Sequence, residues 1–308
     1  MTEDNDRTSA HVIVAVDGSP AADNAVDWAA DEAALRGTRL EVLHAWEWKP
    51  YEGHEWYGEQ LLGVSDDILE AAVTRARARR PELAITATVD HGVAEEVVGR
   101  AGDRAGLLVM GSRGRGGFTG MLLGSVSRSV AAEGRCPLLV VRAGLDGTAE
   151  PRFDGESPRV DTRVVVVGVA DESCLPAVEA AHAEAVARGQ RLRAVHAWSF
   201  PDMPAYGLAG AGPTAEAVRM CRENGEAVLT RTLERVRARH GDASDSVDVV
   251  EDVVNGGRAR VMVEASRDAS LVVVATHKRP GRIGRHLGPV THALLHHAHA
   301  PVLLVPIP

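Results

Sequence analysis

The sequence is poor in cysteine and in long apolar runs, and each shortage narrows what the protein can be. Three cysteines, Cys136, Cys174 and Cys221, lie far apart and form no metal-binding spacing. An odd, sparse count suits a reducing compartment. No apolar stretch approaches the roughly 18 residues of a membrane span. Because the first segment, MTEDNDRTSAH, is acidic and polar, it does not resemble a signal peptide. We therefore expect a cytoplasmic protein without a membrane partner.

Positive charge is also in short supply. The chain has 34 Lys and Arg against 43 Asp and Glu, a formal net charge of −9. Binding to a nucleic-acid backbone requires a basic surface, so we expect no nucleic-acid partner. The apolar fraction of 45% and the charged fraction of 25% are typical of a folded globular protein. The 308 residues suffice for about two domains of ordinary size.

An internal repeat divides the chain into two related halves. The segments RGTRLEVLHAW (36–46) and RGQRLRAVHAW (188–198) are identical at seven of eleven positions, and CPLLVV (136–141) resembles APVLLV (300–305). The segment between the halves is rich in glycine, proline and acidic residues, which is typical of a linker. We predict a tail over residues 1–9, domains over 10–143 and 160–308, and a linker over 144–159.

Apolar strand segments alternate with amphipathic helical segments in both halves. Such alternation predicts an α/β fold, here two tandem doubly wound domains, each a parallel sheet with helices on both faces. One helix is expected over residues 64–80, with Ser65 as its N-cap. In open parallel sheets, ligands bind beyond the carboxyl ends of the strands, where the strand order reverses.

A glycine-rich segment follows the fourth strand segment of the first half. It reads MGSRGRGGFTGMLLGSVS, from Met110 to Ser127, and it leads into a helix. Glycines allow the main chain to approach a ligand closely, and a helix N-terminus offers unpaired N–H groups and a positive dipole end. Together they favour a phosphate site, with Ser125 and Ser127 as hydroxyl donors and Arg113 and Arg115 as partners of phosphate oxygens.

Two further loops should meet the glycine-rich segment in the same crevice. The first is Asp17-Gly18-Ser19, after the first strand, where Asp17 can accept from a ribose hydroxyl or hold magnesium through water. The second is His44-Ala45-Trp46, in which His44 is expected to pack or hydrogen-bond at a strand end. The chain has no Gly-Lys-Ser/Thr of a Walker A loop, and its first strand is not followed by G-x-G-x-x-G. No nucleophile–base pair stands out, so we expect no catalytic residue and a binding module rather than an enzyme.

The spacing Gly111-x2-Gly114-x9-Gly124-Ser125 resembles the ATP motif of the universal stress protein family. The segments VIVAVDGS, LHAW and GSVS…CPLLVV are similar to that family too, and the likeness extends over both halves, as in tandem-domain members of the actinobacterial type. The resemblance implies five-stranded sheets of order 3-2-1-4-5. It also implies an internal pseudo-dimer in which the strands at 137–141 and 301–305 pair, and a homodimer of tandem chains is a further expectation.

The resemblance also implies an adenine-nucleotide site in the first domain. Asp17 and Ala45 would flank ribose and adenine, and Met110 would lie against the base. The phosphates would be held by Gly111, Arg113, Gly114, Gly124, Ser125, Val126 and Ser127. The implied function is an ATP-binding stress-response regulator, with or without magnesium. The alternatives are a slow ATPase, a cyclic-AMP-binding protein and an interaction scaffold that binds no nucleotide.

The second half departs from this motif. An alignment on Pro137 and Pro301 puts Thr276 at the first glycine and Arg279 at the second; the third is kept as Gly288, and Pro289 replaces the serine. An ungapped match of the first strands puts Val169 at the position of Asp17. We therefore expect the second domain to be degenerate for ATP.

A histidine-rich segment, THALLHHAHAP, lies near the end of the chain. His292 and His296 have the i, i+4 spacing of a zinc-binding helix pair, but no cysteine or acidic residue stands nearby. A solvent-facing helix end, where histidine favours the C-terminal dipole, is the preferred interpretation. We expect no metal site there.

Overall fold

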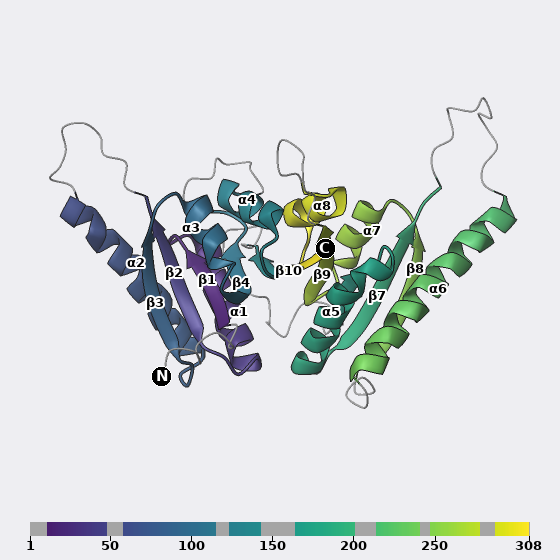
Figure 1. Ribbon diagram of the computed structural model, residues 1–308, viewed down its shortest axis with the longest axis horizontal. Coiled ribbons are helices and arrows are strands. Elements are labelled where there is room, and N and C mark those ends of the chain that lie inside the picture. The colour runs from purple at the N-terminus through teal and green to yellow at the C-terminus, as the bar shows by residue number, and fades with distance from the viewer. Residues whose placement is uncertain are drawn as a thin grey trace, which may run out of the picture.

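The computed structural model describes residues 11–47, 58–114, 123–142, 164–200, 214–240, 247–277 and 287–307 (Figure 1). The elements of the N-terminal domain are β1 (His11–Val16), α1 (Pro20–Leu35), β2 (Leu40–Trp46), α2 (Gly58–Arg79), β3 (Ile85–His91), α3 (Ala94–Ala101), β4 (Ala105–Gly111), α4 (Ser125–Glu133) and β5 (Leu138–Val141). Those of the C-terminal domain are β6 (Val164–Gly168), the short 3-10 helix η2 (Glu172–Cys174), α5 (Leu175–Arg188), β7 (Arg191–Trp198), α6 (Ala215–His240), β8 (Val249–Asn255), α7 (Arg258–Ala265), β9 (Leu271–His277), α8 (Pro289–His297) and β10 (Val302–Ile307).

The strands form one continuous sheet through both domains. Its order is β3-β2-β1-β4-β5-β10-β9-β6-β7-β8, so each half has the order 3-2-1-4-5 and the second half is reversed in space. All neighbours within a half are parallel. The predicted fold class and strand order are confirmed.

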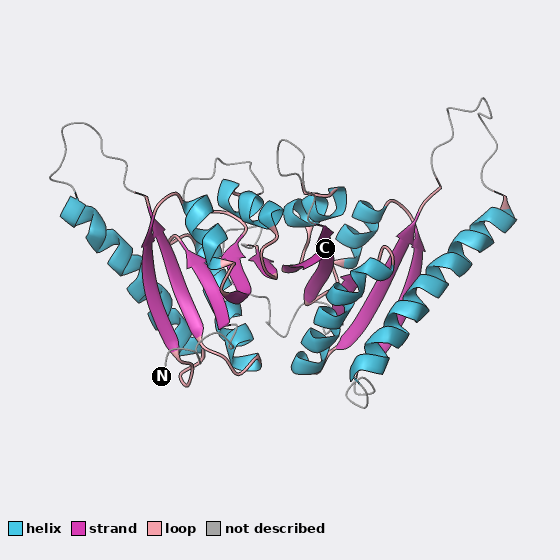
Figure 2. Cartoon of the chain, in the orientation of Figure 1, coloured by secondary structure: helices cyan, strands magenta, loops and turns pink. Residues whose placement is uncertain are grey.

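Helices cover both faces of this sheet (Figure 2). One apolar layer packs α1, α2, α5 and α6 against strand residues such as Val14, Leu107 and Val273. The other packs α3, α4, α7 and α8 against the alternate strand residues, such as Ile13 and Leu108. Successive strand residues point to opposite faces, which is why central strands buried on both sides are almost continuously apolar.

The two domains join at their last strands. β5 and β10 pair antiparallel, with Leu138 opposite Leu304 and Leu139 opposite Leu303. All four side chains are buried. The expected pairing of the segments 137–141 and 301–305 is therefore confirmed.

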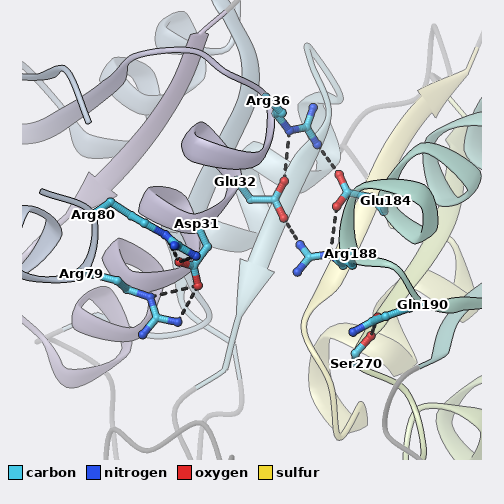
Figure 3. Close-up of polar contacts among 9 residues, drawn as sticks. All are labelled: Asp31, Glu32, Arg36, Arg79, Arg80, Glu184, Arg188, Gln190 and Ser270. Carbon is cyan, nitrogen blue, oxygen red and sulfur yellow. Dashed lines mark hydrogen bonds and ion pairs between the residues drawn. The ribbon is translucent and has the colours of Figure 1, made fainter. Parts of the chain in front are cut away.

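A closed ring of ion pairs adds a polar contact between the domains (Figure 3). Glu32 of α1 and Arg36, the C-cap of that helix, face Glu184 and Arg188 of α5, and each arginine bonds both carboxylates. The two pairs within a helix have Nε–Oε2 distances of 3.1 Å. The guanidinium of Arg188 also lies 5.0 Å from the centre of the Trp28 ring. Burial and the neighbouring Glu184 raise the pKa of Glu32, against the opposing pull of the arginines.

The helix expected over 64–80 begins earlier than its pattern indicates. α2 runs from Gly58, so Ser65 lies inside it and is fully buried instead of capping its start. The expected N-cap is therefore wrong: apolar residues 61, 62 and 64 extend the helical pattern upstream of the serine. Nowhere in the described ranges is a helix both long and apolar enough to cross a membrane.

Candidate functional site

The N-terminal domain has a cavity of about 450 Å³ at the carboxyl ends of β1, β2 and β4. This is the point where the strand order reverses, the usual ligand crevice of a doubly wound sheet. The first turns of α3 and α4 close it from the other side. The lining residues are Ala15, Val16, Asp17, Ala22, Leu43, His44, Ala45, Ala94, Val98, Met110, Gly111, Arg113, Gly114, Leu123, Gly124, Ser125, Val126 and Ser127.

Ten of the twelve predicted site residues line this cavity, and the other two build the turn beside it. Gly18 has φ 73°, a left-handed conformation that favours glycine. Ser19 caps α1 by accepting from the N–H of Ala22 at 3.2 Å, and its hydroxyl donates to the carbonyl of Arg113 at 3.3 Å. The N–H of Ser19 donates to Asp17 Oδ1 at 3.0 Å. Gly18 and Ser19 therefore position Asp17 and the glycine-rich loop.

Two glycines of the motif are required by the space around them. A Cβ at Gly111 would lie 2.8 Å from the carbonyl carbon of Ala21, at the start of α1. A Cβ at Gly114 would lie 2.3 Å from Asp17 Oδ2. The carboxylate of Asp17 thus sits directly against the main chain of the loop, and a side chain at Gly114 would displace it.

The N-terminus of α4 supplies the features that favour an anion. Gly124 is its N-cap and makes no side-chain cap hydrogen bond, and its own N–H donates to the carbonyl of Ser112 at 2.8 Å. The first-turn amides of α4, at residues 125–127, therefore lack intrahelical partners at the edge of the cavity. Arg113 lines the same cavity. Loop residues 115–122, with the expected contact Arg115, lie outside the described residues.

The two serines expected to bind phosphate are already engaged. The Ser127 hydroxyl is buried and donates to the carbonyl of Gly111 at 2.8 Å, so it ties α4 to the end of β4. The Ser125 hydroxyl donates to Glu95 Oε1 at 3.0 Å on the exposed surface. Use of the Ser127 hydroxyl as a phosphate donor would require this bond to a main-chain carbonyl to be exchanged, and it stays a prediction. Glu95 was missed because its position after the third strand carries no motif.

His44 has the positioning role expected of it. Its Nδ1 donates to the carbonyl of Val16 at 2.8 Å, which ties the ends of β1 and β2 together. His196 does the same in the second domain, where Nδ1 donates to Val169 at 2.9 Å. Ala94 and Val98 of α3 also line the cavity, and sequence reasoning missed them because small apolar residues on a helix are usually core.

The matched bonds of His44 and His196 correct the alignment of the first strands. Val169 corresponds to Val16, not to Asp17, and Ala170 follows at the aspartate position. The acid of this loop comes one residue later, as Asp171, which N-caps η2. The ungapped match misplaced the loop because the segment between Val169 and the start of η2 is one residue shorter than that between Val16 and the start of α1.

The register of the last strands corrects the alignment of the glycine loop. Gly111 pairs with Val141, and Ala275 pairs with Val305 at the corresponding position, so Ala275 and not Thr276 replaces the first glycine. The same register puts the second glycine at residue 278, one before Arg279, and both lie outside the described residues. Gly288 and Pro289 stand at the N-cap and first turn of α8, as expected.

The histidine pair of α8 brings no metal-binding set together. The rings of His292 and His296 stack with centres 4.3 Å apart and planes 25° from parallel. Within the described ranges, no three His, Cys, Asp or Glu side chains are placed to hold a metal ion. Burial and the neighbouring histidines lower the pKa of His296, with smaller contributions from Arg142 and Arg128.

Comparison with known proteins agrees with this architecture. The model of the universal stress protein family matches residues 9–142 and again 162–306. Universal stress protein Rv2005c of Mycobacterium tuberculosis is 32% identical over 307 residues, covering 95% of this chain and 96% of that protein. Universal stress protein Rv1996 of the same organism is 30% identical over 324 residues, covering 98% and 96%.

A solved structure shares the fold of the whole chain. A universal stress protein from Archaeoglobus fulgidus covers 97% of this chain and 99% of its own, with a TM-score of 0.66 at 14% identity. The repeat, the sheet order and both family matches lead to one conclusion: the chain belongs to the universal stress protein family, as a tandem-domain member.

Proposed function

We propose that this chain is an ATP-binding regulatory protein of the stress response, with one ATP held in the N-terminal cavity. The observation that carries the proposal is the meeting of Asp17, Gly114 and the uncapped N-terminus of α4 at one end of a cavity of about 450 Å³. This combination pairs a hydrogen-bond acceptor with a set of main-chain donors, as a ribose and a phosphate chain require.

Each part of the nucleotide has a candidate partner. The apolar surface of Ala45, Val98 and Met110 suits the flat face of a base. Asp17 is held by the N–H of Ser19 and can accept from a ribose hydroxyl. The amides of the first turn of α4 and the guanidinium of Arg113 suit the phosphates. With magnesium present, Asp17 or Glu95 offers a carboxylate near the phosphates.

A binding role is favoured over catalysis by how the polar groups are used. His44 Nδ1 is committed to the carbonyl of Val16, and the Ser127 hydroxyl to that of Gly111. The Ser125 hydroxyl donates to a carboxylate, Glu95, but this pair lies on the exposed rim of the cavity. Bound nucleotide would therefore bias contacts of the protein with a partner instead of being turned over.

The first test is the identity and number of bound nucleotides. Mass spectrometry of ligand released from freshly purified protein should show intact ATP, and calorimetry should give one site per chain. Asp17→Asn and Arg113→Gln should each weaken ATP about tenfold or more, since a hydrogen bond to a charged group contributes about 1.5–3 kcal/mol. Asp171→Asn is the matched control in the second domain and should leave ATP binding unchanged.

Other outcomes assign other functions. Two equal ATP sites per chain would contradict the single-site proposal. ADP formed above background, at a rate that collapses in Asp17→Ala without loss of affinity, would make the protein a slow ATPase. If cyclic AMP bound more tightly than ATP, the proposed binding of a phosphate chain by α4 and Arg113 would be wrong. If no adenine nucleotide raised the thermal midpoint of unfolding, the protein would be an interaction scaffold that binds no nucleotide.

A further inference from the structure

The C-terminal domain has a cavity of its own, about 280 Å³, beyond the ends of β6, β7 and β9. Its interior is mainly apolar, with Val169, Val195, Met262 and Val274 among its walls. It occupies the position that the proposed ATP cavity occupies in the first domain. Its smaller volume and different lining indicate that it is built for a different ligand.

The substitutions between the two cavities remove the phosphate-binding features. Ala170 stands at the position of Asp17, Ala275 at that of Gly111 and Pro289 at that of Ser125. Proline removes a main-chain donor from the first turn of α8. Each of these three changes lowers the capacity to hold a chain of phosphates.

A larger side chain also fills part of the space. Met262 of α7 replaces Val98 of α3. It lies so close to the end of β6 that a Cβ at Gly168 would be 3.1 Å from its Cε and its Sδ. Glycine at 168 and methionine at 262 therefore fit each other, and the floor of the cavity becomes apolar and shallower.

Among the described residues at the mouth of this cavity, Arg258 adds a positive charge at a position that is uncharged in the first cavity. Arg258, the first residue of α7, stands where α3 has Ala94. It makes no hydrogen bond or salt bridge with any residue in the described ranges, whereas Arg267, two residues beyond the end of the same helix, pairs with Glu264. An exposed guanidinium at the rim of an apolar cavity is a natural partner for a carboxylate.

Asp171 at the same rim limits the charge that a ligand can carry. Two hydrogen bonds, from the Ser173 hydroxyl at 2.5 Å and the Ser173 N–H at 2.9 Å, lower the pKa of Asp171, and His277 and Arg258 lower it further. The carboxyl is therefore ionised at neutral pH. It repels a polyphosphate more strongly than it repels a single carboxylate.

The first domain supplies part of the wall. Ala131 and Ala132, in the last turns of α4, line this cavity. Figure 1 shows α4 beside α8 at the junction of the domains. The opposite end of α4, Ser125 to Ser127, lines the N-terminal cavity. The C-terminal cavity is thus complete only when the two domains are joined.

We infer that this inter-domain cavity is a second ligand site, which takes a compact, mostly apolar monocarboxylate with its charge on Arg258. The apolar walls receive the body of the ligand, and Ala132 sets the length that fits. The site needs no nucleotide in the N-terminal cavity. Failure of ATP to bind would therefore contradict the proposed function and leave this inference standing.

The test uses the full chain and hexanoate as the probe, with hexanamide as its uncharged match. Titration calorimetry and ligand-observed NMR should show binding of hexanoate and at least about tenfold weaker binding of hexanamide. Arg258→Gln should reduce hexanoate binding to the level of the amide. Arg260→Gln removes the same charge from the same helix outside the cavity lining, and it should have no effect.

A second variant locates the site at the domain junction. Ala132→Phe fills the cavity from the first domain and should abolish hexanoate binding, while the thermal midpoint shows that the fold is kept. Equal binding of hexanoate and hexanamide, or unchanged binding in Arg258→Gln or Ala132→Phe, would overturn the inference. Displacement of hexanoate by ATP would also overturn it, because the cavity would then be a nucleotide site.

Discussion

At two positions of the N-terminal cavity, the residue type is determined by the atoms that lie directly against the main chain. Gly111 faces the first turn of α1, and Gly114 faces the carboxylate of Asp17. The spacing of these glycines can be recognised in the sequence, and it predicts where the cavity lies. The engagement of Ser19 and Ser127 by main-chain carbonyls is not readable, because a hydroxyl near a helix start can serve a cap, a carbonyl or a ligand equally well.

Gly111→Ala tests the close approach of α1 to β4. The new methyl would lie 2.8 Å from a backbone carbon of Ala21, so α1 must shift. We expect a loss of about 1–3 kcal/mol in the free energy of unfolding. Denaturant titration measures it. Gly288→Ala is the control, because nothing lies within 4 Å of its Cβ and φ is −61°. Equal losses in both variants would contradict the steric account.

The three thiols should differ sharply in reactivity. Burial raises the pKa of Cys136 to about 11, and Cys174 is 3% exposed, whereas Cys221 on α6 is partly exposed. At pH 8 about one Cys136 thiol in a thousand is ionised. A disulfide reagent should therefore modify one thiol quickly in the native protein, and Cys221→Ser should abolish that phase. A fast phase that survives this substitution would show that a buried cysteine is accessible.

Elements are less predictable than motifs, because packing decides where a helix begins and how long a connection is. α2 starts at Gly58, ahead of the serine that looked like its cap. The segment between Val169 and η2 is one residue shorter than its counterpart between Val16 and α1, which no local pattern signals. At the end of β9 an alanine, Ala275, stands where the first domain requires Gly111. The first position of the expected motif was thus assigned one residue away, and the degeneracy of the second domain for ATP stays a prediction.

The ring of ion pairs between α1 and α5 leads to a prediction about how strongly these two helices stabilise each other. Arg188 is 12% exposed and bridges Glu32 and Glu184, which are 2% and 7% exposed. Arg188→Ala leaves two buried carboxylates facing each other with one arginine. We expect a loss of about 3–5 kcal/mol in unfolding free energy, as for other broken buried pairs.

Arg191→Ala is the matched control for that ring. Arg191 pairs with Asp248 at 2.8 Å, but both side chains are about half exposed or more, at 48% and 66%. Exposed pairs contribute about 0–1 kcal/mol. Thermal unfolding of the two variants under the same conditions measures the difference. An equally small loss of stability in Arg188→Ala would show that the ring of ion pairs does not stabilise the contact between the domains.

The whole molecule behaves as one sheet with two apolar layers that run through both domains. This much follows from the repeat, from the alternation of strands and helices, and from the resemblance of the last strands to a family interface. The ring of ion pairs does not follow from the sequence. Glu32, Arg36, Glu184 and Arg188 look like ordinary surface i, i+4 pairs until the fold brings the helices together.

A proline in the β5–β10 pairing tests whether the two domains unfold together. Leu139→Pro removes a ladder hydrogen bond and distorts β5, which pairs with β10 through Leu303. We expect faster hydrogen exchange in strands of both domains, including β9 and β6. Glu82→Pro, before β3 and far from the joint, is the control, and its effect should stay local. Faster exchange confined to the first domain would show that the halves unfold independently.

The antiparallel meeting of β5 and β10 has a consequence for how the protein responds to dilution. Because both strands belong to one chain, their association is a first-order event, set by an effective local concentration and not by how much protein is present. The joint therefore persists at concentrations where two separate single-domain chains would part. In a homodimer every substitution appears in both subunits, whereas here a substitution in one domain is absent from the other. The two cavities can therefore diverge in sequence while the pairing of β5 with β10 is retained.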